Sequence, residues 1–257
     1  HFEKMLYDNG QMVSLYSEAF KLTQNPLYKE VINKTLQFVE KDWKTPEGGF
    51  YAALDADSLD AHNHLKEGAF YVWKIPQLKT VIKDDFDLFS QVFNINPFGL
   101  WEEENYVLIQ NQRLESIAKL NHLSTVELEN KKKKWEQILY TEREKRPKPR
   151  LDDKCLTSWN AIMLKGFVDA YKALGNQEYI DIAIENANFI IKKLWSNEGN
   201  LFHSYKNGKS NINGYLEDYC FVIAAFIALY EVTFEEKWLY DAKQLTDYTL
   251  EHFYDEK

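Results

Sequence analysis

The chain contains one pattern three times at fixed spacing. A shift of 151 residues places residues 9–48 on residues 160–199 without a gap, and a further shift of 59 places the second copy on a third. Aromatic residues recur in register across the copies, as at Phe20, Tyr171 and Tyr230. Such a fixed phase is typical of a repeated supersecondary unit, because each copy needs its neighbours to bury its apolar face. The repeat therefore constrains the fold more than any single motif does.

Each copy predicts a helical hairpin. Apolar residues recur at helical spacing, and a turn signal such as Gln24-Asn25-Pro26 interrupts them once. The first helix of each pair is the more apolar, while the second carries Lys and Glu on one face. Inner helices sheathed by outer helices form an (α/α)6 toroid, so we predict an all-α toroid that is present in part. An open α-solenoid is the alternative. The expected hairpins are at about 5–44, 156–195 and 215–253.

Residues 52–154 form an excursion between the first and second copies. Segments near 49–54 and 69–73 are rich in aromatic and small apolar residues, which predicts two short strands paired as a hairpin over one rim. Residues 124–146 predict a long, highly charged helix. The chain also opens at His1-Phe2 inside a segment that already reads as structured, so we expect a piece of a longer protein.

The composition excludes some function classes. A net charge of −9 argues against nucleic acid or an anionic membrane surface as the main partner. No stretch approaches the roughly 20 apolar residues of a membrane span, and no signal peptide is recognisable. The two cysteines, Cys155 and Cys220, form no CxxC pair. We therefore expect reduced thiols in a cytoplasmic protein, with no metal site and no cofactor.

Polar residues gather where the three inner helices begin. Under the two shifts Asp8, Trp159 and Asp218 are equivalent positions. Because all inner helices of a toroid run the same way, these segments should converge on one end of the central funnel, and the acidic loop with Asp55 and Asp57 should emerge on the same rim. Macrodipole and capping preferences alone would also place acids there.

Carboxylates around an aromatic-lined funnel suit a carbohydrate, because acids can divide general acid and base roles while aromatic faces stack on sugar rings. The histidines at positions 62, 64 and 203 are expected at the surface rather than at a metal. The candidate catalytic residues are Asp8, Asp153, Glu217 and Asp218, and the candidate substrate-binding residues are His1, Glu3, Lys4, Asp55, Asp57, Lys154, Ser158, Trp159, Asn160, Tyr215 and Tyr219.

Five segments carry a resemblance to a known family. They are HFEKMLYD at 1–8, GGFYAALDADS at 48–58, EGAFYVW at 67–73, the segment 151–160 with its LDDK and SWN motifs, and LEDY at 216–219. Together, and in this order, they resemble the thioredoxin-domain-containing proteins of the spermatogenesis-associated type. The resemblance covers nearly the whole chain.

The resemblance implies a thioredoxin-like domain upstream, followed by a toroid of the six-hairpin glycosidase type that is related to N-acylglucosamine 2-epimerases. It therefore implies a carbohydrate-binding or carbohydrate-active domain with a sugar ligand. Those epimerases use histidines of inner helices, and the second and third copies have none there, so such chemistry would need His1 or a residue beyond this chain. The alternative is a non-catalytic interaction module that serves the thioredoxin-like domain.

Overall fold

The computed structural model describes residues 2–255 and divides the chain into two compact units. The helical-repeat unit consists of Lys4–Leu54 and Leu151–Lys257, and the inserted unit consists of His1–Glu3 and Asp55–Arg150. Each unit has its own cluster of buried apolar side chains. No helix in residues 2–255 combines the length and apolar character that crossing a membrane requires.

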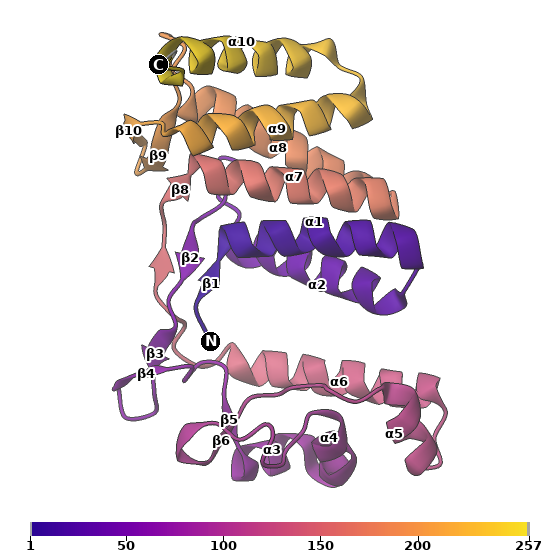
Figure 1. Ribbon diagram of the computed structural model, residues 1–257. Coiled ribbons are helices and arrows are strands. Elements are labelled where there is room, and N and C mark those ends of the chain that lie inside the picture. Colours follow the sequence, from indigo (N-terminus) through magenta and orange to yellow (C-terminus); the bar gives the residue numbers. More distant parts are fainter. Residues whose placement is uncertain (1, 256–257) are drawn as a thin grey trace. The chain divides into compact units, whose positions relative to one another are not determined.

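The helical-repeat unit is built from pairs of antiparallel helices. Neighbouring inner helices pack side by side, and each outer helix packs on the inner helix that precedes it (Figure 1). The inner helices are α1 (Leu6–Thr23), α7 (Thr157–Leu174) and α9 (Leu216–Thr233). The outer helices are α2 (Pro26–Asp42), α8 (Gln177–Phe189), which continues into the π-helical turn η3 (Ile190–Leu194), and α10 (Glu236–Phe253).

The turn inside each hairpin repeats in detail. Every inner helix ends at a residue in the left-handed region, which is Gln24 at φ 53°, Gly175 at φ 68° and Phe234 at φ 56°. In the first two hairpins the next residue is an asparagine, Asn25 or Asn176, whose side chain accepts the backbone N–H two residues on. Both devices satisfy backbone groups that a helix end leaves unpaired. The 151-residue shift therefore repeats the same local geometry.

The loop that follows each outer helix repeats as well. Isolated bridges join Lys44 to Phe50 and Trp195 to Leu201, at equivalent positions of the first two copies. Each loop turns at a glycine with positive φ, which is Gly48 (91°) in one loop and Gly199 (94°) in the other. Glycine suits this conformation because a side chain would be strained there. Gly48 and Gly199, which the 151-residue shift superimposes, therefore occupy the same position in the same kind of turn.

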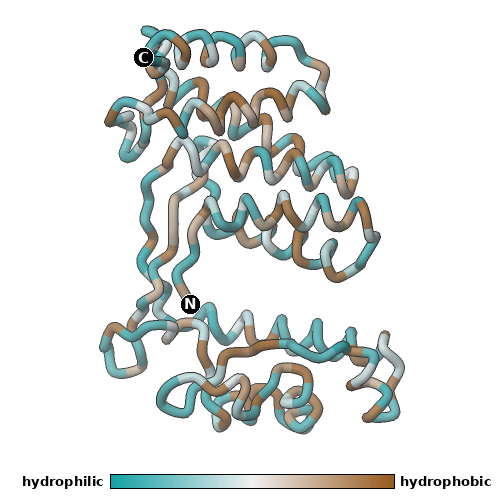
Figure 2. Tube along the Cα trace, viewed as in Figure 1, coloured by the Kyte–Doolittle hydropathy of each residue, from teal (hydrophilic) through white to brown (hydrophobic). Residues whose placement is uncertain are grey.

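Helix α7 lies at the centre of the unit, with α1 on one side and α9 on the other. Its residues are buried almost all round from Thr157 to Ala170. Two glycines let α1 and α7 approach closely: a Cβ atom on Gly166 would lie 3.0 Å from the Gly10 carbonyl oxygen. Hydrophobic residues run along α7 and α9 (Figure 2). The apolar sequence of α9 predicts a helix that is buried all round, but Phe221 and Ile227 are more than a third exposed, so only part of that helix is buried in this way.

Two small antiparallel sheets lie where the inner helices begin. Strand β1 leads directly into α1 and β8 leads directly into α7, so both sheets mark the N-terminal end of the inner helices (Figure 1). The first sheet has the order β1-β2-β7 and consists of Lys4–Met5, Ala53–Leu54 and Leu151–Asp152. The second has the order β10-β9-β8 and consists of Lys209–Asn213, Phe202–Lys206 and Cys155–Leu156.

The inserted unit packs short helices around a core that contains Trp73, Phe89 and Trp135. The long helix begins with a capping box, in which Ser124 and Glu127 bond reciprocally. Its helices are α3 (Ile75–Ile82), α4 (Phe86–Val92), α5 (Leu114–Leu120) and α6 (Thr125–Arg143), with 3₁₀ turns η1 (Lys83–Asp85) and η2 (Glu102–Glu104). Its strands are β3 (Asp57–Leu59), β4 (Leu65–Glu67), β5 (Trp73–Lys74) and β6 (Asn105–Tyr106), paired β3 with β4 and β5 with β6.

The expected hairpin between strands near 49–54 and 69–73 is wrong. Only Ala53–Leu54 of the first segment is a strand, and it pairs with β1 and β7. The second segment turns at Gly68 (φ 72°), whose carbonyl oxygen accepts the N–H groups of Tyr71 and Val72. Trp73 then pairs with Tyr106. The apolar residues of both segments serve the cores of two different units, and composition alone cannot separate that burial from strand pairing.

Candidate functional site

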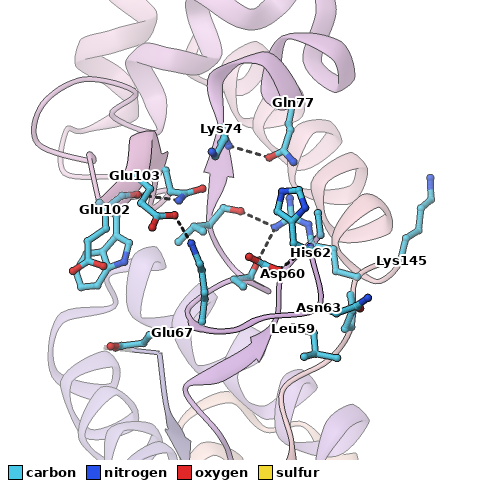
Figure 3. A pocket seen from close by; sticks show the side chains of 18 residues that line it. Leu59, Asp60, His62, Asn63, Glu67, Lys74, Gln77, Glu102, Glu103 and Lys145 are labelled. Atoms are coloured by element: carbon cyan, nitrogen blue, oxygen red, sulfur yellow. Dashed lines mark hydrogen bonds and ion pairs between the residues drawn. The ribbon is translucent and has the colours of Figure 1, made fainter.

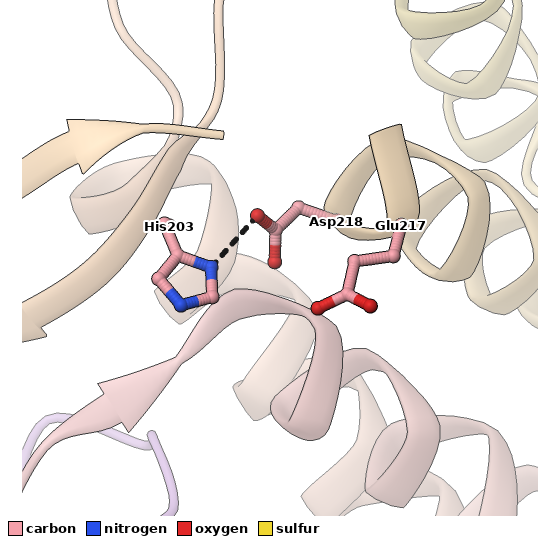
Figure 4. Close-up of side chains that lie close together, drawn as sticks. All are labelled: His203, Glu217 and Asp218. Atoms are coloured by element: carbon pink, nitrogen blue, oxygen red, sulfur yellow. Dashed lines mark hydrogen bonds and ion pairs between the residues drawn. The ribbon is translucent and has the colours of Figure 1, made fainter. Parts of the chain in front are cut away.

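The candidate site lies at the start of α9, on the side of the unit where the inner helices begin. The β9–β10 hairpin precedes α9, and β9 also pairs with β8, which leads into α7. His203 is therefore held on a strand that is fixed on both sides. Its side chain, 18% exposed, converges with Glu217 and Asp218 from the first turn of α9 (Figure 4).

Asp218 is fully buried and ties three segments together. Its Oδ1 accepts the backbone N–H of Ser158 at 2.9 Å, at the start of α7. Its Oδ2 accepts the backbone N–H of Tyr215 at 2.8 Å and lies 2.9 Å from Nδ1 of His203. Because the carboxylate only accepts hydrogen bonds, the proton of the His203–Asp218 bond belongs on Nδ1. Asp218 therefore fixes both the orientation and the tautomer of His203.

The fixed tautomer leaves Nε2 of His203 as a proton acceptor. Within residues 2–255 this nitrogen has no hydrogen-bond partner. The ring of Tyr215, a half-exposed residue, lies beside the imidazole with 4.6 Å between ring centroids. An imidazole that is oriented by a buried carboxylate and open at its other nitrogen can take up and return a proton.

Glu217 adds a second carboxylate on the exposed side of the pair. It lines a shallow hollow of about 630 Å³ together with Tyr215, Leu216, Cys220 and Phe221. One ligand atom each of His203, Glu217 and Asp218 lies within 4.8 Å of the others, and this set of donors could hold a metal ion. An ion at Asp218 would compete with the three hydrogen bonds that its oxygens already accept.

Two of the predicted ligand-binding residues are committed to the core instead. Asn160 is buried and makes four hydrogen bonds, to the N–H and C=O of Phe50, to the carbonyl of Leu156 and to Asn186. That uses its whole hydrogen-bonding capacity, so the prediction that it binds a ligand is wrong. Tyr219 is 1% exposed and stacks on Tyr248, and burial raises its pKa to about 12. Its predicted role as a stacking platform for a sugar is therefore also wrong.

Other predicted residues lie near the same end of the inner helices. Trp159 is half-buried against Tyr7, with 4.7 Å between ring centroids, and remains a candidate platform. Asp8 is exposed in the first turn of α1, where the helix dipole favours an acid. The backbone of Ser158 binds Asp218, and its buried hydroxyl has no hydrogen-bond partner within residues 2–255.

The remaining candidates on this unit form local pairs. Asp153 forms an ion pair with Lys206 of β9, and this contact holds the pKa of the Asp153 carboxyl below its usual range. Lys154 lies 3.2 Å from Asp152, and both side chains are exposed by more than a third. Lys4 is half-buried in β1. Within residues 2–255 neither Asp153 nor Lys154 forms a hydrogen bond or ion pair with His203 or Asp218.

Glu3, Asp55 and Asp57 belong to the inserted unit, whereas the site described above consists of residues of the helical-repeat unit alone. Asp55 accepts the N–H of Asp57 at 3.3 Å, and its other carboxylate oxygen lies 3.8 Å from Arg150. His1 lies outside the described residues.

Sequence reasoning missed His203. The expectation that it is a surface residue is wrong, because Asp218 binds its ring. It stands outside the inner helices and lies 15 residues before its partner, so the helical repeat does not point to it. Residues 202–206 show no period-2 alternation, because the apolar residues Phe202 and Tyr205 are three positions apart, so no clear sequence signal marked the strand that carries His203.

Some known proteins are similar to this chain in sequence, and others are similar to it in fold. It is 34% identical to an uncharacterised protein of Caenorhabditis elegans, covering 95% of this chain and 37% of that protein. It is 31% identical to spermatogenesis-associated protein 20 of Homo sapiens, covering 99% of this chain and 36% of that protein. The chain thus spans about a third of the length of these relatives. No family model matches the chain.

Among solved structures, a cellobiose 2-epimerase from Spirochaeta thermophila superposes with a TM-score of 0.57 at 10% identity, covering 97% of this chain and 44% of that one. A glycoside hydrolase family 76 mannosidase from Bacteroides thetaiotaomicron superposes with a TM-score of 0.53 at 11% identity, covering 98% and 46%. At such identities the likeness establishes the fold alone. It confirms the all-α (α/α)6 toroid class that the repeat predicts.

Proposed function

The chain belongs to the family of spermatogenesis-associated protein 20, and from that premise we propose that its toroid binds a carbohydrate, with His203 as the acid–base group that removes a proton from the sugar and returns one to it. The observation that carries the proposal is the 2.9 Å bond between His203 Nδ1 and the buried Asp218 carboxylate. The toroid fold, which a sugar epimerase and a mannosidase share, supports a sugar as the substrate class.

The burial of Asp218 favours proton transfer over glycoside hydrolysis. Hydrolysis by paired carboxylates needs two acids that both reach the substrate. Asp218 is fully buried and accepts three hydrogen bonds, so it acts through His203 as a positioning residue. Its carboxylate also stabilises the imidazolium that forms when Nε2 takes a proton. This assignment replaces the direct catalytic role that the sequence suggests for Asp218.

Glu217 and Tyr215 complete the proposed site. Glu217 is exposed beside the pair and can hydrogen-bond sugar hydroxyls or exchange a second proton. Tyr215, 53% exposed and next to the imidazole, offers a ring face for stacking on a sugar. A reaction that removes and returns a proton at a carbon next to a sugar carbonyl, as an epimerase or isomerase requires, fits these parts.

The test is whether the protein catalyses the exchange of carbon-bound sugar protons with solvent. The protein would be incubated in D₂O with a panel of mono- and disaccharides, and deuterium at carbon would be followed by NMR. We expect incorporation with one sugar class, loss of it in His203→Gln, and normal exchange in the control His252→Gln, which changes an exposed histidine of α10.

Binding is measured separately by thermal shift. A ligand at about a hundred times its dissociation constant stabilises by roughly 2.7 kcal/mol, a shift of several degrees. Binding without exchange would leave a carbohydrate-binding domain and remove the acid–base role of His203. If no sugar binds, the proposal fails, and the non-catalytic module serving a thioredoxin-like domain becomes the better hypothesis.

A further inference from the structure

The inserted unit contains a pocket of its own, remote in sequence from the toroid site. Its volume is about 780 Å³, within the usual range for small-molecule sites. Its walls come from the β3–β4 loop, the turn after Gly68, the start of α3, the segment around η2 and the segment that follows α6 (Figure 3). All of these lining residues belong to the inserted unit.

The distinctive group in this pocket is the guanidinium of Arg146. Its Nη1 donates to the backbone carbonyl oxygens of Ala69, Phe70 and Val72, at 3.4, 3.1 and 2.7 Å. Its Cζ atom lies over the Trp73 ring, 3.8 Å from the ring centroid. These contacts hold the guanidinium in one orientation, but none of them carries a negative charge.

The positive charge of Arg146 is uncompensated. Within residues 2–255 no carboxylate forms an ion pair with it or with Arg143, the last residue of α6. Burial and the neighbouring Arg143 lower the pKa of Arg146 to about 10, so the group remains protonated at neutral pH. A partly buried cation without a counter-ion is costly, and a bound anion would remove that cost.

The acids closest to the pocket are largely occupied. Glu103 pairs with Lys66 at 2.5 Å, and Asp60 accepts the backbone N–H groups of His62 and His64 at 2.7 and 3.0 Å. Figure 3 shows Glu102 and Glu103 on the wall opposite His62. The imidazole of His62 makes no hydrogen bond within residues 2–255, so it can donate to a ligand.

We propose that this pocket binds a small anionic metabolite, bearing a carboxylate or a phosphate group, with Arg146 as the anchor. Because Nη1 already donates to three carbonyl oxygens, Nε and Nη2 are the guanidinium nitrogens without a hydrogen bond within residues 2–255. That edge of the planar group matches either anion, because it can donate two parallel hydrogen bonds. His62 supplies a second donor from the β3–β4 loop. Glu102, an exposed acid on the opposite wall, supplies acceptors for hydroxyl groups of the same ligand. This proposal does not rest on the sugar chemistry proposed for the toroid.

The experiment is isothermal titration calorimetry with two probes, inorganic phosphate and succinate, and with glucose as the neutral control. We expect one saturable site for at least one anion and none for glucose. A preference between phosphate and succinate identifies which group the natural ligand carries. Absence of binding for both anions in the millimolar range overturns the proposal.

The variants locate the site. Arg146→Lys keeps the charge but loses the fork, and should weaken binding roughly tenfold. His62→Gln should weaken it by a smaller factor, while His64→Gln, whose side chain does not line the pocket, should bind like the wild type. If Arg146→Lys fails to fold, equal binding by the two histidine variants is enough to overturn the proposal. His203→Gln should bind the anion normally, which separates this result from the fate of the toroid site.

Discussion

Asn160 and Tyr219 occupy the same position of successive inner helices, and each accepts a backbone N–H of a loop, one through an amide oxygen and the other through a hydroxyl. Asn160 Oδ1 accepts the backbone N–H of Phe50 at 2.8 Å, and the hydroxyl of Tyr219 accepts the backbone N–H of Leu201 at 2.9 Å. Phe50 and Leu201 are themselves equivalent under the 151-residue shift. Helices α7 and α9 thus each hold the loop that follows the outer helix of the preceding copy.

The side chains of Asn160 and Tyr219 should contribute unequally to the free energy of unfolding. Asn160→Ala removes four hydrogen bonds, three of them buried, and leaves backbone groups of Phe50 unpaired, so we expect a loss of about 3 kcal/mol in the free energy of unfolding. Tyr219→Phe removes a single acceptor and should cost about 1–2 kcal/mol. Urea denaturation measures both. Equal, negligible losses would show that the loops are held by packing alone.

Gly48 and Gly199 provide a matched pair for the turn that follows each outer helix. Both have positive φ, so alanine at either position should cost about 1–2 kcal/mol. A Cβ atom on Gly48 would also lie 2.8 Å from Cγ of Glu185, whereas the nearest atom to one on Gly199 is 3.6 Å away, on Tyr248. We therefore expect Gly48→Ala to lower the melting temperature more than Gly199→Ala. The reverse order would contradict this packing.

The two cysteines should differ in reactivity. Burial raises the pKa of the Cys155 thiol to about 12, whereas Cys220 is exposed. Because the thiolate is the reactive form, Cys155 should resist a thiol reagent in the folded protein. At mildly alkaline pH the native protein should label at Cys220 alone, and the denatured protein at both. Mass spectrometry of labelled peptides reads the result, and Cys220→Ser should abolish native labelling.

Asp85 should make the stability of the inserted unit depend on pH. Its bond to Lys131 at 2.6 Å, and a second to the Trp135 indole, hold the pKa of the Asp85 carboxyl below its usual range. A lowered folded-state pKa stabilises the fold above the unfolded-state value, about 3.9, and that stabilisation is lost as the pH falls through the folded-state pKa.

Asp85→Asn should therefore increase hydrogen exchange in α4 and α6 at neutral pH and make no difference in strong acid. The control is Asp84→Asn, which changes an exposed neighbour. A pH-independent effect of Asp85→Asn would mean that the side chain contributes by packing rather than by charge.

The sequence by itself determined the helical hairpins of residues 2–255 and the turns between their helices. Periodic burial and turn chemistry are local properties, so Gly175 and Asn176 announce the end of one helix and the start of the next. The clustering of acids at the inner-helix starts was equally visible. Which of those acids matter was not, because capping and catalysis favour the same residue types at the same positions.

Only the tertiary structure decided the roles of individual side chains. The strands at the inner-helix starts are too short to show a period, and their pairing partners are distant in sequence. The bond between His203 and Asp218 exists because the β9–β10 hairpin returns to the first turn of α9. Asn160 and Tyr219 are buried because each binds the backbone of a loop that is distant in sequence. Whether a polar group meets solvent, a ligand or a buried backbone group depends on contacts between segments far apart along the chain, which local pattern does not encode.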